Sequence, residues 1–515
     1  MTSKLLPDHF GSHTQSKFTG EMSQVVSVRN KKTITCQSIV MVWLLMIVLS
    51  GSDVYSTTPT LSFDNPGTNK FETVYKDALS NLRSINTVQS CGKRILRAGS
   101  DYGRPWTRDG SLNSLCAASL LEPDVAENTL WFITADNKVA GQWWDRTIWI
   151  IAAWEHFKIT GNDTFLSNAY TYTKNTLTYH EENYYNSKYG LFRGLSHLCD
   201  GIAGYPSPPA PAKPRKSSFA GEYAGVDYLL PTSIQAIYYG AYRAAAAMAE
   251  RLGKPRPEIE GYQAKALRLK TQADQHLWAP KYHRYGYFIH GTGMKAGALE
   301  NHQEGAGLAF SLWFGLADDA KAKTMMKHFH NQPYGMTCVW PHFKRFSDAK
   351  PGRHNVATWP QMSAYWALGA LSRGGYGIFK WELENVTRLL HSTSPDIREI
   401  YDSMTGRPEG GWQNGRHWDA THDQTWCATG YIGMIHKGVF GMTFQPDGIT
   451  FRPYLAREWG ACSLSGLRYR NMTLNIRLTG SGTSVSSFKI NGSQSDNHFL
   501  DAGGTGENSI SITLK

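Results

Sequence analysis

The sequence predicts a mainly α-helical protein, an (α/α)6 barrel followed by a small C-terminal β-domain. From about Phe71 to Met442 the helical periodicity recurs in twelve segments, the number that two rings of six helices require. Several segments, such as "TIWIIAAWEHF", are apolar nearly all round, as expected for helices of an inner ring. After Phe440 apolar and polar residues alternate between Gly, Asn and Ser turns, which is typical of strands.

The clearest helical segment starts at Thr232 or Ser233. Apolar residues recur there at i, i+3, i+4 and i+7, one of these two residues is expected to cap the start, and Gly253 with Pro255 ends the helix. The other eleven expected helices, in chain order, are Phe71–Leu82, Gly110–Leu121, Val125–Asp136, Thr147–Ile159, Leu166–Tyr184, Glu258–His276, Glu304–Leu316, Ala320–Phe329, Gln361–Ser372, Phe379–His391 and Thr425–Lys437.

The N-terminal region is expected to be a leader. Lys31 and Lys32 precede the apolar run "IVMVWLLMIVLS", which is short for a membrane span and is followed by small and polar residues, as in a secretory signal peptide. We therefore expect export, to the periplasm or outside the cell, with no membrane span in the mature chain. An uncleaved membrane anchor is the alternative, and Met22 is an alternative start. The expected segments are a leader at 1–58, a barrel domain at 59–442 and a β-domain at 443–515.

Composition narrows the function classes. The net charge of +11 is spread along the 515 residues without a dense Lys/Arg block, which argues against a nucleic-acid partner. The seven Cys show no zinc-type spacing, so neither a metal nor a cofactor is expected, and no disulfide pairing or oligomeric state can be assigned. The 17 Trp and 26 Tyr often stand beside Gly, Asp or Arg, which suits stacking against sugar rings, although large cores also use Trp.

Two early loops carry candidate sugar-binding residues. In "YGRPWTRDGSLNSL", Trp106, Arg108 and Asp109 stand directly before a helix, where an Arg and Asp pair can grip sugar hydroxyls. A capping Asp in a structural ion pair explains the same pattern equally well. In "GQWWDRTIW", Trp144 is a candidate pocket wall, and Asp145 is a candidate helix N-cap, sugar ligand or acid.

Two later loops carry candidate catalytic carboxyls. The long Pro- and Gly-rich segment from Tyr189 to Pro231 holds the three acids Asp200, Glu222 and Asp227, and loops of that length are usually functional or disordered. The stretch "SPDIREIYDSMTGRPEGGW" holds Glu399. Two acids on separate loops at one barrel end fit glycosidic-bond hydrolysis, in which one protonates the leaving oxygen and the other activates water. No serine-hydrolase, phosphate-loop or zinc-protease motif is present in the sequence.

The chain resembles the six-hairpin glycosidases, most closely the inverting α-glycosidases of glycoside hydrolase family 63, the trehalases and the neutral invertases. "IREIYDSMTG" is similar to the segment around their catalytic base, which implies that Glu399 is the base, that Tyr401 orients or screens the site and that Asp402 braces the loop. "DQTWCATGYIG" resembles the helix that follows the base and implies a pocket role for Trp426. "WTRDG" resembles the segment that holds the terminal sugar.

The resemblance is weaker at the acid. Family 63 carries its acid in a Glu-Ser-Gly-x-Asp motif, and here "LSHLCDGIAGYP" stands in the corresponding place, which makes Asp200 the best match. Asp227, Glu222 and Asp145 remain alternatives, the first two because the invertases carry their acid nearer to the next helix. "HNVATWPQMSAYWALGAL" resembles an inner-ring segment of such barrels and implies that His354 and Trp359 line the pocket.

The resemblance implies an exported enzyme that removes a terminal α-linked sugar from an oligosaccharide or polysaccharide by inversion. A glycoside phosphorylase, which uses phosphate in place of activated water, is one alternative. An α-L-rhamnosidase is another, because the chain after Phe440 resembles the β-appendage of rhamnosidases and phosphorylases. A polysaccharide lyase and a catalytically inactive glycan-binding barrel are the remaining alternatives.

Overall fold

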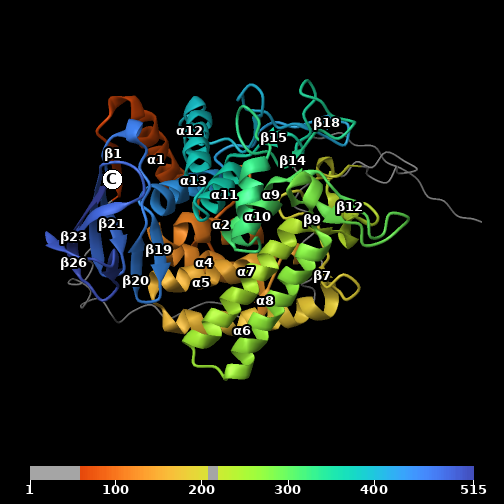
Figure 1. Ribbon diagram of the computed structural model, residues 1–515, viewed down its shortest axis with the longest axis horizontal. Coiled ribbons are helices and arrows are strands. Elements are labelled where there is room, and N and C mark those ends of the chain that lie inside the picture. Colours follow the sequence, from red (N-terminus) through yellow and green to blue (C-terminus); the bar gives the residue numbers. More distant parts are fainter. Residues whose placement is uncertain (1–57, 207–217) are drawn as a thin grey trace, which may run out of the picture. The chain divides into compact units, whose positions relative to one another are not determined.

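The computed structural model describes residues 58–206 and 218–515. The expected leader at 1–58 lies outside these residues except for Thr58. Within the described residues, six helices form a closed inner ring in which each contacts the next (Figure 1). In order around the ring they are α2 (Thr107–Asn113), α5 (Ile148–Thr160), α7 (Thr232–Arg251), α9 (Gly305–Trp313), α11 (Pro360–Leu371) and α13 (Thr425–Gly433).

The outer helices alternate with the inner ones along the chain. They are α1 (Asn69–Ser80), α4 (Pro123–Phe132), α6 (Asp163–Tyr184), α8 (Arg256–His276), α10 (Asp319–His328) and α12 (Tyr376–Ser392). Each expected helix is present, and α2 and α13 are prolonged by π-helical turns at Ser114–Ala118 and Met434–Val439. Because inner and outer helices alternate, the inner helices run in the same direction and present their N-termini at one end of the barrel. The (α/α)6 prediction is confirmed.

Burial explains the two kinds of helix. Every residue of α13 is buried, and so is every residue of α11 except Leu371, because these helices pack against neighbours in the ring and against the outer layer. Outer helices such as α8 bury one stripe only, formed by Tyr262, Ala266, Leu269 and Ala273. The nearly uniform apolar pattern that predicted the inner ring is therefore explained by burial of these helices on both sides.

Two expected helix caps are wrong. The residue before α7 is Pro231, and Thr232 and Ser233 both lie inside the helix without capping it. The backbone N–H of Ser233 instead donates to the carboxylate of Glu304, so the cap comes from a distant segment. Asp145 does not cap α5 either, since Thr147 occupies that position and Asp145 ends a short 3₁₀ turn. A sequence pattern cannot reveal a cap supplied from elsewhere in the fold.

The chain after α13 forms strands, as expected. The main sheet has the order β1-β21-β22-β26-β23-β24, with β22 and β26 parallel and the other neighbours antiparallel. Residues along β22 alternate strictly between buried and half-buried, which is the period-two pattern of a sheet with one packed face. The bounds are β1 (Thr60–Phe63), β21 (Cys462–Tyr469), β22 (Met472–Thr479), β23 (Val485–Ile490), β24 (Ser493–Gln494) and β26 (Gly506–Leu514).

The sheet also includes an element that the sequence pattern did not predict. The edge strand β1 comes from the start of the described chain and pairs with β21, Phe63 opposite Cys462. A second small sheet contains β19 (Met442–Gln445), β20 (Gly448–Phe451) and β25 (Phe499–Asp501). The boundary at residues 442 and 443 stays a prediction.

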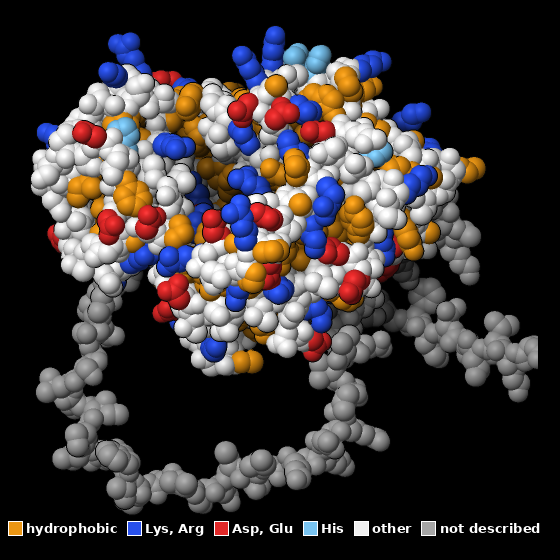
Figure 2. All heavy atoms as spheres, turned by 60° about the horizontal axis from the view of Figure 1, so that its bottom comes forward, with side chains coloured by type: hydrophobic (Ala, Val, Ile, Leu, Met, Phe, Trp, Pro, Cys, Tyr) orange, Lys and Arg blue, Asp and Glu red, His pale blue; other side chains and the backbone are white. Residues whose placement is uncertain are grey.

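The described surface carries charges of both signs. Figure 2 shows Lys and Arg side chains interspersed with Asp and Glu over one face, without a continuous block of one sign. As for membrane spans, no helix among the described residues has the length and apolar character to cross a bilayer.

Candidate active site

Charged and aromatic side chains gather where the inner helices begin. Because the N-termini of parallel helices carry partial positive charge, this end of the barrel favours carboxylates. The residues concerned lie within three residues of the start of their helices: Arg108 and Asp109 at α2, Asp145 before α5, Ser233 at α7, Glu304 before α9, Trp359 before α11 and Trp426 at α13. Asp200 and Glu399 come from loops, the former between α6 and α7 and the latter between α12 and α13.

Glu399 is held by two donors. Nη2 of Arg353 lies 2.6 Å from its Oε2, and Oγ1 of Thr421 donates to the same oxygen at 2.8 Å. The residue is only 3% exposed. Burial raises the pKa of Glu399 above its ordinary value, while Arg353 and Thr421 oppose the rise. Among the described residues, Oε1 has no hydrogen-bond partner, so this oxygen is free to bind water.

Asp200 lies between two basic residues. Nη2 of Arg108 donates to its Oδ2 at 3.1 Å, and Nε2 of His354 lies 3.5 Å from its Oδ1. The side chain keeps 29% of its surface exposed, so it can meet a bound molecule. Burial would raise the pKa of Asp200, but Arg108 and then His354 outweigh it and bring the pKa to about 2.

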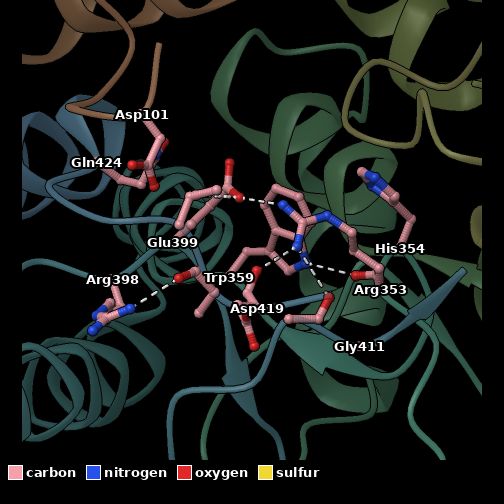
Figure 3. Close-up of polar contacts among 12 residues, drawn as sticks. Asp101, Arg353, His354, Trp359, Arg398, Glu399, Gly411, Asp419 and Gln424 are labelled. Atoms are coloured by element: carbon pink, nitrogen blue, oxygen red, sulfur yellow. Dashed lines mark hydrogen bonds and ion pairs between the residues drawn. The ribbon is translucent and has the colours of Figure 1, made fainter. Parts of the chain in front are cut away.

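The neighbours Arg353 and His354 connect these two carboxyls. Figure 3 shows the Arg353 guanidinium facing Glu399 while the His354 ring extends away from it. Nε1 of Trp359 donates to the backbone oxygen of Arg353 at 3.0 Å and fixes this segment. His354 packs its ring 4.9 Å from that of Trp359. One short segment therefore holds both predicted catalytic residues.

The protonation of His354 can be deduced from its partners. Its Nδ1 lies 3.2 Å from the backbone oxygen of Leu198, and a carbonyl oxygen can only accept, so Nδ1 carries the hydrogen. Burial lowers the pKa of His354 to about 4, so the ring is neutral at neutral pH and Nε2 is an acceptor. Nε2 of His354, 3.5 Å from Oδ1 of Asp200, is therefore placed to accept a hydrogen bond whenever the Asp200 carboxyl is protonated. With a pKa of about 2, Asp200 is ionised near neutral pH in this structure, so an acid role needs a bound molecule that raises this pKa.

A second group of buried charges surrounds Arg108. Asp145 lies 3.3 Å from His197 through Oδ1 and Nδ1, and Arg108 donates to the backbone oxygen of His197. Burial raises the pKa of Asp109 and of Asp145 to about 7 in each case, although Arg108 opposes it. Burial likewise keeps the pKa of His197 well below its ordinary value. Part of these two carboxyls is therefore neutral near pH 7 and can donate hydrogen bonds.

Several buried polar atoms of this region have no hydrogen-bond partner among the described residues. They are Nε of Arg108, Nε1 of Trp144, Nε2 of His197 and Nε1 of Trp426, while Oδ1 of Asp145 and Nδ1 of His197 face each other at 3.3 Å. Buried polar groups are normally satisfied by protein, water or ligand.

The predicted aromatic residues separate into two groups. Trp359 and Trp426 lie 6.0 Å apart edge to face, and the guanidinium of Arg108 lies over the Trp426 ring at 5.5 Å, so these rings belong to the site. Trp144 is buried against Phe219. Trp106 is half-buried under the guanidinium of Arg104.

Tyr401 lies in the core. Its side chain is fully buried, and its hydroxyl pairs with that of Thr393 at 2.8 Å. Asp402 accepts the backbone N–H groups of Met404 and Thr405, so it braces the loop, and Gly406 takes a positive φ of 71° in the turn. Tyr401 therefore supports the loop from inside and presents no free hydroxyl to a pocket.

The other acids proposed from the long loop lie in different surroundings. Asp227 forms an ion pair with Arg193 at 3.5 Å, and Glu222 is exposed at the end of a short 3₁₀ helix. The charge of Asp200 raises the pKa of Glu399, which places Asp200 close to that carboxyl. Of the three acids in the segment from Tyr189 to Pro231, Asp200 is the one that the fold brings to Glu399.

Four residues of the site escaped the sequence interpretation: Arg353, Thr421, His197 and Tyr102. Tyr102 lies so close to Glu399 and Arg353 that their charges influence its hydroxyl, whose pKa is raised mainly by burial. Among the described residues, that hydroxyl has no hydrogen-bond partner. Arg353 could have been found because it directly precedes His354, whereas the other three carry no recognisable pattern.

Metal binding has no candidate in the described part of the chain. No cluster of three or more His, Cys, Asp or Glu side chains there could hold an ion. The cysteines of that part are free thiols, of which Cys91 is exposed and the others are buried.

Comparisons with known proteins bear on the fold and on the family. A search of curated proteins by sequence finds no match. A structure described as a sialidase superposes with a TM-score of 0.65 at 16% identity, over 85% of this chain and 40% of that one. A family 78 rhamnosidase of Bacillus sp. GL1 gives 0.52 at 14% identity, over 88% of this chain and 44% of that one. This chain thus spans less than half the length of either protein.

A third structure matches over its whole length. The family 63 mannosylglycerate hydrolase from Thermus thermophilus, in complex with Tris, superposes with a TM-score of 0.53 at 16% identity, over 70% of this chain and 100% of that one. At such identities these likenesses show the fold alone. The family model of the mannosylglycerate hydrolase MGH1-like glycoside hydrolase domain matches residues 145–427, more than half of the chain and a span that includes Asp200, His354 and Glu399. The chain therefore belongs to the MGH1-like glycoside hydrolase family.

Proposed function

We propose that this glycoside hydrolase removes a terminal α-linked sugar by an inverting mechanism, with Asp200 as the acid and Glu399 as the base. The observation that carries the proposal is the Arg353 and His354 segment, which binds the two carboxyls at one barrel end through adjacent residues. Inverting enzymes need two such carboxyls far enough apart, roughly 6.5–9.5 Å, to admit a water molecule.

Glu399 is suited to activate that water. Its Oε2 is occupied by Arg353 and Thr421, which leaves Oε1 to accept a proton from water. The ion pair with Arg353 favours the ionised carboxylate that a base needs. The raised pKa makes that carboxylate a stronger base than an exposed glutamate.

Asp200 must hold a proton until the glycosidic oxygen takes it. We infer that a bound sugar raises the pKa of Asp200 and that the neutral His354 ring then accepts a hydrogen bond from the protonated carboxyl at Nε2. The exposed part of the Asp200 side chain allows contact with the leaving oxygen. Arg108 favours the ionised form of Asp200 through its hydrogen bond to that carboxylate. If a sugar hydroxyl accepted a hydrogen bond from Arg108, the interaction between Arg108 and Asp200 would weaken and the pKa of Asp200 would rise.

Asp145 is the rival acid that one observation favours. Its pKa of about 7 keeps part of it protonated at neutral pH without a bound sugar. However, it is only 4% exposed and faces His197, so it reaches a bound sugar less readily than Asp200. Asp200→Asn and Asp145→Asn separate the two, because loss of the true acid impairs substrates with poor leaving groups far more than aryl glycosides with good ones.

The experiment that tests the function is a screen of aryl α-glycosides, natural disaccharides and mannosylglycerate, the compound in the name of the Thermus thermophilus relative. The anomer released first is read by NMR. Inversion supports the proposal, and net retention contradicts it. Turnover that depends on added phosphate would support a phosphorylase, and release of L-rhamnose would support the rhamnosidase alternative.

We also propose that the protein is exported, on the strength of the basic residues and apolar run near its N-terminus. Expression of the full chain in a secreting host, followed by N-terminal sequencing of the released protein, tests this. Recovery of the intact chain in the membrane fraction would support an anchor instead.

A further inference from the structure

We infer that Glu304 is a positioning residue for the acid Asp200, which it serves by fixing the loop that carries Asp200 to the start of α7. This role rests on the proposed function. Glu304 belongs to none of the motifs recognised in the sequence, and it lies directly before α9, where β13 (Gln303–Glu304) pairs with β14 (Val339–Trp340).

The carboxylate of Glu304 joins three parts of the barrel. Oγ of Ser196, four residues before Asp200, donates to Oε1 at 2.5 Å. Oγ of Ser233, in the first turn of α7, donates to the same oxygen, and the backbone N–H of Ser233 donates to Oε2 at 3.1 Å. Glu304 thus caps α7 from a distance. The same carboxylate binds the acid loop, the segment from Ser196 to Asp200.

The surroundings of Glu304 are unusual for a carboxylate. The residue is 1% exposed, and no cation contributes to its pKa, which burial raises to about 7 against the serine hydrogen bonds. The charge of Glu304 contributes to the raised pKa values of three buried neighbours, Tyr205, Tyr287 and Cys338. A buried acid without a cationic partner costs stability even where it accepts hydrogen bonds. A role in the site explains why the fold contains one directly beneath the acid loop.

A continuous path of hydrogen bonds leads from Glu304 to Asp200. Ser233, bound to Glu304, accepts the backbone N–H of His197 at 3.1 Å. The backbone oxygen of His197 accepts from Arg108, and Arg108 donates to Asp200 at 3.1 Å. The position of the Asp200 carboxyl is therefore set through its own loop and through its ion-pair partner, and both routes begin at Glu304.

Replacement of Glu304 by glutamine would disturb this arrangement at one atom. The amide oxygen of the new side chain could still accept from the serine hydroxyls, but its NH₂ group would face the backbone N–H of Ser233, so two donors would meet. The acid loop would shift by a fraction of an ångström to relieve the conflict. Catalytic rates are sensitive to such shifts, since a displacement of about 1 Å can cost about 10²-fold.

Substrates that differ in leaving group test the inference. The methyl α-glycoside of the sugar identified by the screen needs protonation of its leaving oxygen, whereas the α-glycosyl fluoride does not; α-D-mannosyl compounds are tried first. For Glu304→Gln we expect kcat on the methyl glycoside to fall about 10- to 100-fold, and kcat on the fluoride and both KM values to change less than about threefold. Asp200→Asn should show the same selectivity, and Glu304→Asp should restore part of the methyl-glycoside activity.

Two further variants make the result decisive. Ser196→Ala removes one donor and leaves the carboxylate, and it should show a weaker form of the same selectivity; it decides the question if Glu304→Gln does not fold. Glu382→Gln is the matched control, since Glu382 is a fully buried carboxyl bound to Asn331 and outside the acid loop. It should leave the ratio of the two activities unchanged.

Equal losses on both substrates for Glu304→Gln and Ser196→Ala would overturn the inference and leave Glu304 a purely structural residue. Failure of the proposed function looks different. In that case the unaltered enzyme cleaves neither α-glycoside, or Asp200→Asn shows no dependence on the leaving group.

Discussion

Arg353 and His354 are consecutive in sequence, yet they contact different carboxyls: Nη2 of Arg353 lies 2.6 Å from Glu399, and Nε2 of His354 lies 3.5 Å from Asp200. A single peptide unit thus fixes the relation between the proposed base and the proposed acid, which come from loops about 200 residues apart in the chain. Small displacements of this segment would alter both groups together.

Replacement of Glu399 by Gln should remove most turnover and preserve sugar binding. The amide keeps the size of the side chain but cannot take a proton from water, and a general base contributes about 10²–10⁴-fold. Steady-state kinetics and calorimetric titration with product sugar measure the two effects. Glu409→Gln, on the same loop and bonded to His417, is the control and should keep its activity. Undiminished turnover of Glu399→Gln would rule out the assignment.

Replacement of Arg353 by Met should move the acidic limb of the pH–rate profile to higher pH. Arg353 lowers the pKa of Glu399, so its removal lets burial raise that pKa further, and the base then keeps its proton to a higher pH. An opposite charge at such a distance is worth about 1–3 pKa units. Arg398→Met, a neighbouring arginine that donates to the backbone oxygen of Ala420, is the control. An unmoved acidic limb in Arg353→Met would disprove this electrostatic role.

Replacement of His354 by Phe distinguishes two descriptions of Asp200. If the neutral His354 ring accepts a hydrogen bond from protonated Asp200, removal of the ring lowers the pKa of Asp200. The basic limb of the pH–rate profile then moves to lower pH by about one unit. If His354 is instead a cation that holds Asp200 ionised, the same variant raises that pKa and moves the limb upward. We expect the downward shift, measured as kcat against pH for a methyl glycoside.

Replacement of Tyr102 by Phe should weaken substrate binding without destabilising the protein. Its hydroxyl has no hydrogen-bond partner among the described residues, so only a bound molecule loses a bond, worth about 1.4 kcal/mol or tenfold in KM. Tyr401→Phe is the contrasting variant, because its hydroxyl is bonded to Thr393. It should lower the melting temperature and leave KM unchanged, and a reversal of these two results would show that the site is assigned wrongly.

Replacement of Glu382 by Gln should reduce the loss of stability at alkaline pH. Burial raises the pKa of Glu382 from 4.5 to about 8, so between these values the folded protein keeps a proton that the unfolded chain has lost. Stability from this group is therefore present at pH 4.5 and lost as pH rises to 8. The melting-temperature difference between about pH 5 and about pH 8 should shrink by about 2 °C or more in the variant. An identical difference would contradict the assigned protonation.

Local patterns were sufficient to predict the helices but insufficient to predict how their ends are capped. Helices α11 and α13 are apolar nearly all round because they are buried on both sides, so the residue pattern was sufficient to predict the inner ring. The cap of α7 comes from Glu304, 71 residues beyond Ser233, and nothing near Ser233 indicates it. Strand β1 was missed for the same reason, because its partner β21 lies at the other end of the chain.

The sequence by itself determined the barrel, the β-domain and Glu399 as the proposed base, because each rests on residue spacing or on a contiguous motif. It left four acids as candidates for the proton donor. Only the tertiary structure brings Asp200 to His354 and Arg108, turns Asp227 toward Arg193 and places Glu304 beneath the acid loop. The physical reason is that the pKa and the reach of a carboxyl depend on neighbours within a few ångströms, and here those neighbours come from segments far apart in the chain.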